Sequence, residues 1–474
     1  MPALILRLAA SSPELQRGLD RIRSEFEVPT SFDDSVQRAA DAAAHASHDL
    51  GERIDARSTE FLTIDPAGSR DLDQAYFASR NGDGIRVNYA IADVAAFVGA
   101  NDVVDSDAHR RGVTVYMPDQ RATLYPQVID EDAASLLPDQ ERPALLWTID
   151  LDATGVATDW RLERATVRSR RAMTYVEAQH EIDSSSADAS LLLLREIGRV
   201  RKDQEKARGG VSLNVPAQEL RPVKGGFELA YETPLDVENW NAQVSLLAGL
   251  CAAATMIKAG VGILRTLPPP DPHIVDRLRR SARALGVSWP DGASYADVAG
   301  NLAPATPGAA AFLTQATRAL RGAGYTLIGA TPGPPPVHSA IAAPYAHVTA
   351  PLRRLADRFA NELLVAASAD RAPPAWAVDG LSVLPDAMQA GSHRAAGVER
   401  AVVDLAECLV MGGHVGEVFT GTVVDVNDRG STVQLTGPPI IAKLDDAMAK
   451  LGEAISVKLV AADPERRRVE FALS

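Results

Sequence analysis

Three aspartates lie close together in a segment whose residue types suit metal binding. They are Asp65, Asp71 and Asp73, and together they span nine positions. A strand-like run precedes Asp65, and the Pro-Ala-Gly-Ser after it is typical of a turn that could fold Asp65 back beside the other two. Asp71 and Asp73 are two positions apart, so an extended backbone would project both carboxylates to one side. Converging carboxylate oxygens suit Mg²⁺, although an acidic surface turn would explain the same spacing.

A second segment, 347–357, places a histidine ahead of two adjacent arginines. Pro351 can begin a helix, and the first turn of a helix offers free N–H groups to an anion. Arg353 and Arg354 would add positive charge where a phosphate could bind, although a solvated helix face is the alternative interpretation. Carboxylates that hold a metal, together with arginines that hold a phosphate, describe metal-assisted phosphodiester hydrolysis.

Motifs of several other enzyme classes do not occur in the sequence. There is no G-x-S-x-G nucleophile elbow, no Walker-A phosphate loop and no H-E-x-x-H zinc motif. Gly260 and Gly262 lack the third glycine of a dinucleotide-binding fingerprint, and the nine histidines show no zinc-ligand spacing. The two segments above are therefore the strongest indication of chemistry.

Composition limits the class of protein further. The chain has 474 residues, which predicts two or three domains, and 46% of them are hydrophobic, which excludes a mainly disordered protein. The net charge of −14 argues against non-specific coating of nucleic acid, but it allows a local basic channel. Two cysteines exclude a disulfide framework and predict a cytoplasmic protein. The uncharged stretch 239–257 contains several polar residues, so we expect a buried helix and no membrane association.

Hydrophobic periodicity divides the chain into helical and strand-like parts. Helical patterns cover the first 55 or so residues, 175–364 and 386–411. Strand-like runs bounded by turn residues occupy 60–162 and the region after Gly413, where they have the pattern of a small β-barrel. The chain therefore has a helical part, a strand-rich part, a second helical part and a small C-terminal barrel in succession, which indicates an α+β protein.

With these segments in place, the chain resembles the catalytic domain of the ribonuclease II/ribonuclease R family, followed by an OB-fold domain. Matching segments occur in family order and spacing between about residues 55 and 370, namely 63–73, 91–94, 111–118, 167–169 with 174–175, and 345–354. The resemblance implies an α+β fold whose catalytic domain is a mixed sheet with surrounding helices. Its four parts are a helical N-terminal domain at 1–55, an RNB catalytic domain at 56–370, a helical extension at 371–412 and an OB-fold RNA-binding domain at 413–474.

Roles carried over from the family to matching positions give a set of expected site residues. The expected catalytic residues are Asp73, Gln74 and Arg353, the expected Mg²⁺ ligands are Asp65, Asp71 and Asp73, and the expected substrate-binding residues are Tyr116, Arg168, His347, Arg354 and Glu399. Arg353 matches an arginine that stabilises the scissile phosphate, and Tyr116 resembles the aromatic residue that packs against the 3′ nucleotide. The implied reaction is processive 3′→5′ hydrolysis of single-stranded RNA to nucleoside 5′-monophosphates, with a water activated between two Mg²⁺ ions.

The chain also departs from the family pattern. Gln74 stands where the family usually has a fourth aspartate, so it stays open whether a second Mg²⁺ ion binds. Gln243 and Leu250 replace an acid and an amide that are usual in the family's long buried helix. Two rival functions therefore stay open, an RNA-binding protein of the same fold with a weakened catalytic centre and an exonuclease that prefers DNA.

The expected partner is single-stranded RNA, or RNA with a 3′ overhang, bound by a monomer. Because the protein is acidic, an RNA path must be locally basic, and arginines and lysines cluster at 161–171 and 195–206. Phe419 is the candidate stacking residue of the C-terminal barrel. Only about 55 residues precede the catalytic segment, too few for the two cold-shock barrels of larger family members, so we expect an entrance that tolerates duplex.

Overall fold

The computed structural model describes residues 13–46, 52–215, 217–223, 226–232, 234–304, 306–329, 333–427, 430–436, 440–445 and 449–474. Its main sheet has the strand order β1-β8-β2-β3-β4-β7, and β8 also pairs with β7. The strands are β1 (Ile54–Asp55), β2 (Phe61–Asp65), β3 (Gln74–Asn81), β4 (Gly84–Ala92), β7 (Glu141–Leu151) and β8 (Ala157–Thr174). The strand-like runs of the sequence near 61, 85 and 144 correspond to β2, β4 and β7.

Strand β8 closes this sheet on itself because its two halves have different partners. Its first part pairs antiparallel with β7 up to Arg168, and its last part, from Ser169 to Thr174, runs parallel to β2. The enclosed side chains form a large apolar core that includes Phe61, Tyr89 and Trp147, each at most 1% exposed. A closed sheet leaves its central strands no unpaired edge, so the strand ends that carry the acidic segment are held firmly.

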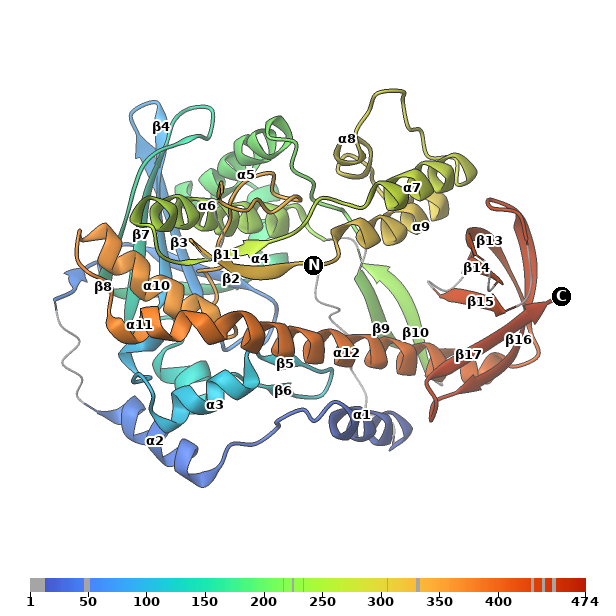
Figure 1. The fold of residues 1–474 in the computed structure, drawn as a ribbon, viewed down its shortest axis with the longest axis horizontal. Coiled ribbons are helices and arrows are strands. Elements are labelled where there is room, and N and C mark those ends of the chain that lie inside the picture. Colours follow the sequence, from blue (N-terminus) through green and yellow to red (C-terminus); the bar gives the residue numbers. More distant parts are fainter. Residues whose placement is uncertain are drawn as a thin grey trace.

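Helices cover the sheet and extend away from it (Figure 1). Around the sheet lie α2 (Asp34–His45), η1 (Val94–Ala96), α3 (Val103–Arg111), η2 (Ile129–Ala133), α4 (Tyr175–Asp183), α5 (Ala189–Ala207), α6 (Asp236–Ala259), α10 (Leu355–Ser368), α11 (Ala375–Gly380) and η4 (Leu381–Val383). A separate apolar cluster joins α7 (Pro272–Ala284), α8 (Tyr295–Ala299), α9 (Pro307–Ala316) and η3 (Thr317–Leu320). Short strand pairs complete this part, namely β5 (Val115–Tyr116) with β6 (Arg121–Ala122), β9 (Ala217–Val223) with β10 (Gly226–Glu232), and β11 (Ile263–Thr266) with β12 (Gly324–Leu327).

The long helix α12 (Leu384–Met411) runs from the sheet to the C-terminal barrel (Figure 1). Its first turns belong to the main core, whereas Val398 and Leu405 pack with α1 (Pro13–Glu25) and with the barrel. The barrel has the strand order β15-β14-β13-β16-β17, and the strands are β13 (Val418–Asn427), β14 (Gly430–Leu435), β15 (Ile441–Asp445), β16 (Ala454–Asp463) and β17 (Arg468–Leu473), preceded by η5 (Gly412–His414). The predicted α+β architecture with a C-terminal barrel is confirmed. The N-terminal helices share the cores of α12 and α3 instead of forming their own, while residues 1–12 and 47–51 lie outside the described part of the chain.

Helix α6 is the uncharged stretch that the sequence predicts to be a buried helix. By length and composition alone it could cross a membrane, but half of its most apolar window is buried inside the protein, as in core helices of soluble proteins. It packs against α4, α5 and α10. Gln243, which replaces the family's usual acid, donates a hydrogen bond of 2.5 Å from Nε2 to the buried carboxylate of Glu205 on α5. A second acid at 243 would place two carboxylates side by side and lose this donor, so the amide suits this environment.

A glycine in α6 lets the segment before α10 approach the helix closely. The Gly249 carbonyl accepts a hydrogen bond of 3.1 Å from the Ala346 N–H, and a Cβ at 249 would lie 2.6 Å from the Ala346 carbonyl oxygen and closer still to the ring of Tyr345. We therefore expect Gly249→Ala to lower the free energy of unfolding by about 1–3 kcal/mol, because the segment must move away. Chemical denaturation measures this. Gly412→Ala is the control, since nothing lies within 4 Å of the Cβ that it adds; an equally small effect in both variants would contradict the close packing.

Candidate active site

The carboxylates of the acidic segment come together where β2 ends and β3 begins. Asp65 is the last residue of β2, and Gln74 is the first of β3, the antiparallel neighbour of β2. Asp71 and Asp73 lie in the connection and are 9% and 3% exposed. The carboxylates of an acidic surface turn would be exposed to solvent. The burial of Asp71 and Asp73 therefore favours a metal-binding site over a surface turn.

Hydrogen bonds from a second segment fix the backbone of this connection. Ser135 Oγ accepts from the Leu72 N–H at 3.0 Å and donates to the Arg70 carbonyl at 2.6 Å. The Leu136 N–H donates to the Leu72 carbonyl at 3.0 Å. The segment that follows η2 therefore positions Asp71 and Asp73, and no motif in that segment predicts this contact.

A tight turn before α10 brings the predicted arginine to the carboxylates. The Leu352 N–H donates to Asp73 Oδ1 at 2.8 Å, and Arg353 Nε lies 3.1 Å from Asp73 Oδ2. The side chain of Arg353 remains 42% exposed, so its guanidinium can also contact a ligand in solvent. The expectation that Pro351 begins a helix is wrong, because α10 begins at Leu355. The Asp357 carboxylate accepts a hydrogen bond of 2.8 Å from the Ala350 N–H and so stabilises a turn there instead.

Two side chains donate hydrogen bonds to the Asp71 carboxylate. One is Tyr116, which was predicted as a site residue, and the other is Arg121, which was not. Tyr116 on β5 donates its hydroxyl proton to Asp71 Oδ2 at 2.8 Å, while the residue as a whole remains 43% exposed. On β6, Arg121 Nη1 donates to Asp71 Oδ1, and its Nη2 lies 3.1 Å from Glu131 Oε1. Arg121 was not predicted as a site residue; it lies just after the segment 111–118, and only that proximity connects it with the site in the sequence.

Gln74 makes a contact that an aspartate could not make. Its amide nitrogen donates a hydrogen bond to the Thr349 carbonyl, which ties β3 to the segment before α10. Because an ionised carboxylate has no proton to donate, Asp at this position would lose the bond. The departure from the family pattern is therefore accommodated by the surrounding backbone.

Burial disfavours the charged form of the carboxylates. It raises the pKa of Asp65 to about 7 and that of Asp73 to about 8; Arg353 opposes both shifts and Asp71 adds to both. In the described part of the chain, the carboxylates contact arginines and N–H groups, and no three His, Cys, Asp or Glu side chains already surround one point. Asp71 is paired with Arg121 and Asp73 lies beside Arg353, yet the hard oxygen donors of the three aspartates are of the type that a divalent cation such as Mg²⁺ prefers.

The other predicted substrate-binding residues have varied surroundings. His347 Nδ1 lies 2.7 Å from the Tyr325 hydroxyl, and burial lowers the pKa of His347 well below its usual range, so the ring is neutral. Arg354 forms an ion pair of 2.6 Å with Asp357. Arg168 lies on β8 opposite Glu141, and Glu399 is an exposed residue of α12. Their roles in binding RNA stay predictions.

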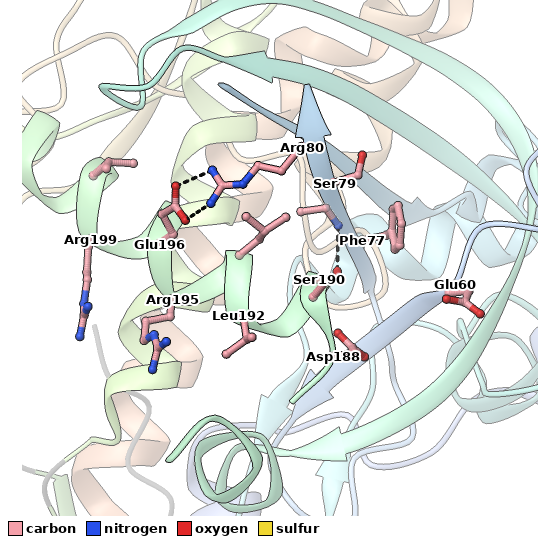
Figure 2. Close-up of a pocket in the computed structure, with 14 residues that line it drawn as sticks. Glu60, Phe77, Ser79, Arg80, Asp188, Ser190, Leu192, Arg195, Glu196 and Arg199 are labelled. Atoms are coloured by element: carbon pink, nitrogen blue, oxygen red, sulfur yellow. Dashed lines mark hydrogen bonds and ion pairs between the residues drawn. The ribbon is translucent and has the colours of Figure 1, made fainter. Parts of the chain in front are cut away.

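A cavity of about 760 Å³ lies elsewhere, between β3 and α5 (Figure 2). Its lining is mostly apolar, with an Arg80–Glu196 ion pair at one side. Arg195 and Arg199, from the predicted basic cluster, line it, but none of the predicted site residues does. The cavity is therefore separate from the carboxylate site.

This closed sheet with its carboxylate–arginine site and C-terminal barrel is the architecture of a known class of RNA-degrading enzymes. The RNB domain family matches residues 53–370, and the RNase II-type exonuclease C-terminal S1 domain matches residues 417–474. The chain therefore belongs to the RNB-domain family, a family of 3′→5′ exoribonucleases, as the sequence resemblance implied.

Curated relatives agree with this membership, and a solved structure has the same fold. The chain is 29% identical over 336 residues to exosome complex exonuclease RRP44 homolog A of Arabidopsis thaliana, which covers 66% of this chain and 35% of the relative. It is 25% identical over 481 residues to ribonuclease R of Vibrio cholerae, covering 89% and 57% respectively. Ribonuclease R of Mycoplasma genitalium, solved in complex with ribose-methylated single-stranded RNA, has the same fold with a TM-score of 0.85 at 19% identity, covering 98% of this chain and 78% of that one. The chain thus spans between about a third and just over half of the length of these two curated relatives.

Proposed function

We propose that this protein is a Mg²⁺-dependent, processive 3′→5′ exoribonuclease that hydrolyses single-stranded RNA to nucleoside 5′-monophosphates. One observation carries the proposal. Asp73 lies between the Leu352 N–H and the Arg353 guanidinium, so the acidic segment and the arginine segment, nearly 280 residues apart, meet at one point. Metal-assisted phosphodiester hydrolysis needs these two components side by side.

Each residue of the site has a part in this chemistry. Asp65, Asp71 and Asp73 would hold the metal, which polarises the phosphate and activates a water when bound. The exposed part of the Arg353 guanidinium donates two parallel hydrogen bonds to the scissile phosphate and stabilises the charge that develops on it. The exposed ring of Tyr116 stacks on the terminal base, while its hydroxyl bond to Asp71 keeps the ring oriented.

Part of the positive charge of the predicted RNA path is paired with neighbouring carboxylates. Arg164 is 2.7 Å from Asp93 and 2.5 Å from Glu362, and Arg171 is 2.5 Å from Glu181. These arginines are neutralised by neighbours, so their contribution to RNA binding is reduced. Arg353 is also paired, with Asp73, but it lies at the carboxylate site where the scissile phosphate would bind, so Arg353 and Tyr116 remain the proposed RNA contacts.

The departure at Gln74 favours a second candidate, an RNA-binding protein of this fold with a weakened catalytic centre. Matched RNA and DNA oligonucleotides, incubated with the protein and Mg²⁺, test both candidates and the DNA-preferring rival. Release of nucleoside monophosphates from RNA alone supports the proposed function. Binding of RNA without any release would establish the second candidate, and faster release from DNA the rival.

We also propose that the protein is a monomer of the cytoplasm. Cys251 and Cys408 are both buried and unpaired, which suits a reducing compartment. Size-exclusion chromatography with light scattering tests the monomer, and fractionation of cells tests the compartment. A dimer or a membrane-bound fraction would contradict these assignments.

We expect Gln74→Asp to lower the Mg²⁺ concentration that gives half-maximal rate. The amide oxygen of glutamine can ligate a metal, but it adds no negative charge, whereas the carboxylate does. The variant loses the hydrogen bond to the Thr349 carbonyl, at a cost of about 1 kcal/mol in stability. Initial rates over a series of free Mg²⁺ concentrations measure the effect, and an unchanged or higher requirement would contradict the assignment of position 74 to the metal site.

We expect the enzyme to digest into duplex RNA from a 3′ overhang. Opening each base-pair step costs about 1–2 kcal/mol, and removal of the released nucleotide makes each opening irreversible. Duplexes with 3′ overhangs of increasing length, resolved on a sequencing gel, measure how far digestion proceeds. A stop several nucleotides before the junction for every overhang would refute this expectation.

A further inference from the structure

A carboxylate that the sequence analysis did not assign is buried without partners near the proposed active site. Asp130 lies on η2 (Ile129–Ala133) and is 1% exposed. Neither of its carboxylate oxygens has a hydrogen-bond partner among the residues that the structure describes. A buried carboxylate normally accepts several hydrogen bonds or contacts a cation, so this one lacks what it needs.

The surrounding contacts place Asp130 beside the metal-binding aspartates. Its neighbour Glu131 shares Arg121 with Asp71, and Ser135 and Leu136, one turn later, bond directly to the 70–72 backbone. Asp71 and Asp73 are the charges that act most strongly on the Asp130 carboxylate after its burial. The side chain is therefore within electrostatic reach of both aspartates.

Repulsion from Asp71 and Asp73 would favour a side chain that turns away or is neutral. Position 130 is nevertheless an aspartate, and no residue that the structure describes donates a hydrogen bond to its carboxylate. Such an arrangement is destabilising by itself, and it becomes favourable when a cation binds between the carboxylates. Arg121, a cation that acts on the Asp130 carboxylate, is already shared by Asp71 and Glu131.

We propose that Asp130 is a fourth carboxylate of the metal site, which supplies the negative charge that Gln74 lacks. The inference rests on the proposed function, because it assumes that the Asp65–Asp71–Asp73 cluster binds Mg²⁺. It explains two unusual features together. Gln74 uses its amide to join β3 to Thr349, and both carboxylate oxygens of Asp130 lack a hydrogen-bond partner among the described residues.

Metal binding without RNA tests this proposal directly. Isothermal titration calorimetry with MgCl₂, and the loss of the free Mn²⁺ signal in electron paramagnetic resonance, give the affinity of the full chain and its variants. We expect Asp130→Asn to weaken binding at least about tenfold. Asp132→Asn is the matched control, since it removes an equal charge from the same turn at a side chain that is 63% exposed and paired with Arg142; it should leave the affinity nearly unchanged.

A second variant and a double variant make the outcome decisive. Asp130→Ser, which also removes the charge, replaces Asp130→Asn if circular dichroism shows that the asparagine variant is unfolded. Gln74→Asp in the Asp130→Asn background should recover most of the lost affinity, because it returns a carboxylate to the cluster. Affinity that is equal to wild type in both single Asp130 variants, or no recovery in the double variant, overturns the proposal.

Asp73→Asn separates this proposal from the proposed function. If Asp73→Asn weakens Mg²⁺ binding and Asp130→Asn does not, only the role of Asp130 is wrong. If neither the wild-type chain nor Asp73→Asn binds Mg²⁺ or Mn²⁺ measurably, the metal-dependent function itself fails.

Discussion

Asp73→Asn is expected to lower the rate of RNA hydrolysis by at least about 100-fold while RNA affinity changes little. Asp73 is the point where the two halves of the site meet, since it contacts the Leu352 N–H and the Arg353 guanidinium. Asparagine keeps the shape but removes the charge that a metal ion requires, and it leaves the exposed RNA-binding surface intact. Single-turnover kinetics measures the chemical step, and fluorescence anisotropy with EDTA present measures binding.

The control for this variant is Asp83→Asn, which removes an equal charge from the exposed turn between β3 and β4. It should keep the wild-type rate. Hydrolysis by Asp73→Asn at that same rate would show that the carboxylate site is not where the reaction takes place.

Arg353→Lys is expected to lower kcat by about 100- to 1,000-fold and to weaken RNA binding much less. A guanidinium presents two parallel N–H groups to a phosphate, whereas an ammonium offers a single point charge and cannot reproduce that geometry. Lysine still supplies the positive charge beside Asp73, so the fold and the carboxylates should be little disturbed. Arg353→Ala should be at least as slow as Arg353→Lys.

Comparison of kcat with the RNA dissociation constant distinguishes two roles for this arginine. Arg80→Lys serves as the control, because Arg80 forms an exposed ion pair with Glu196 far from the carboxylates. Equal losses in binding and turnover for Arg353→Lys would reduce Arg353 to a residue that only positions the substrate.

The elements with a strong local pattern could be predicted from the sequence. Strands β2, β4 and β7 have β-branched and aromatic residues between turn signals, and α12 has a long helical period, so each was expected near its observed place. The double pairing of β8 could not be foreseen, because it depends on partners that lie about 20 and 100 residues earlier in the sequence. Helix α10 begins later than expected because Asp357 stabilises a turn that competes with the helix.

The same contrast applies to the candidate site. Asp65, Asp71, Asp73 and Arg353 could be found because their spacing repeats a known motif. Arg121 and Asp130 come from segments without such a motif, and only the fold brings them to the aspartates. The acidic run at 130–132 was visible in the sequence, but acidic runs usually lie in solvent, so it gave no reason to expect burial.

The closure of the sheet by β8 has a consequence for synthesis of the protein on the ribosome. Strand β2 emerges early, but its partner, residues 169–174, follows about a hundred residues later. At 5–20 residues per second, one edge of β2 stays unpaired for roughly 5–20 s. During that interval an apolar strand edge is open to pairing with other nascent chains, and chaperones that protect such edges would raise the yield of folded protein. Pulse-labelled synthesis with and without a chaperone would show this as a difference in soluble yield.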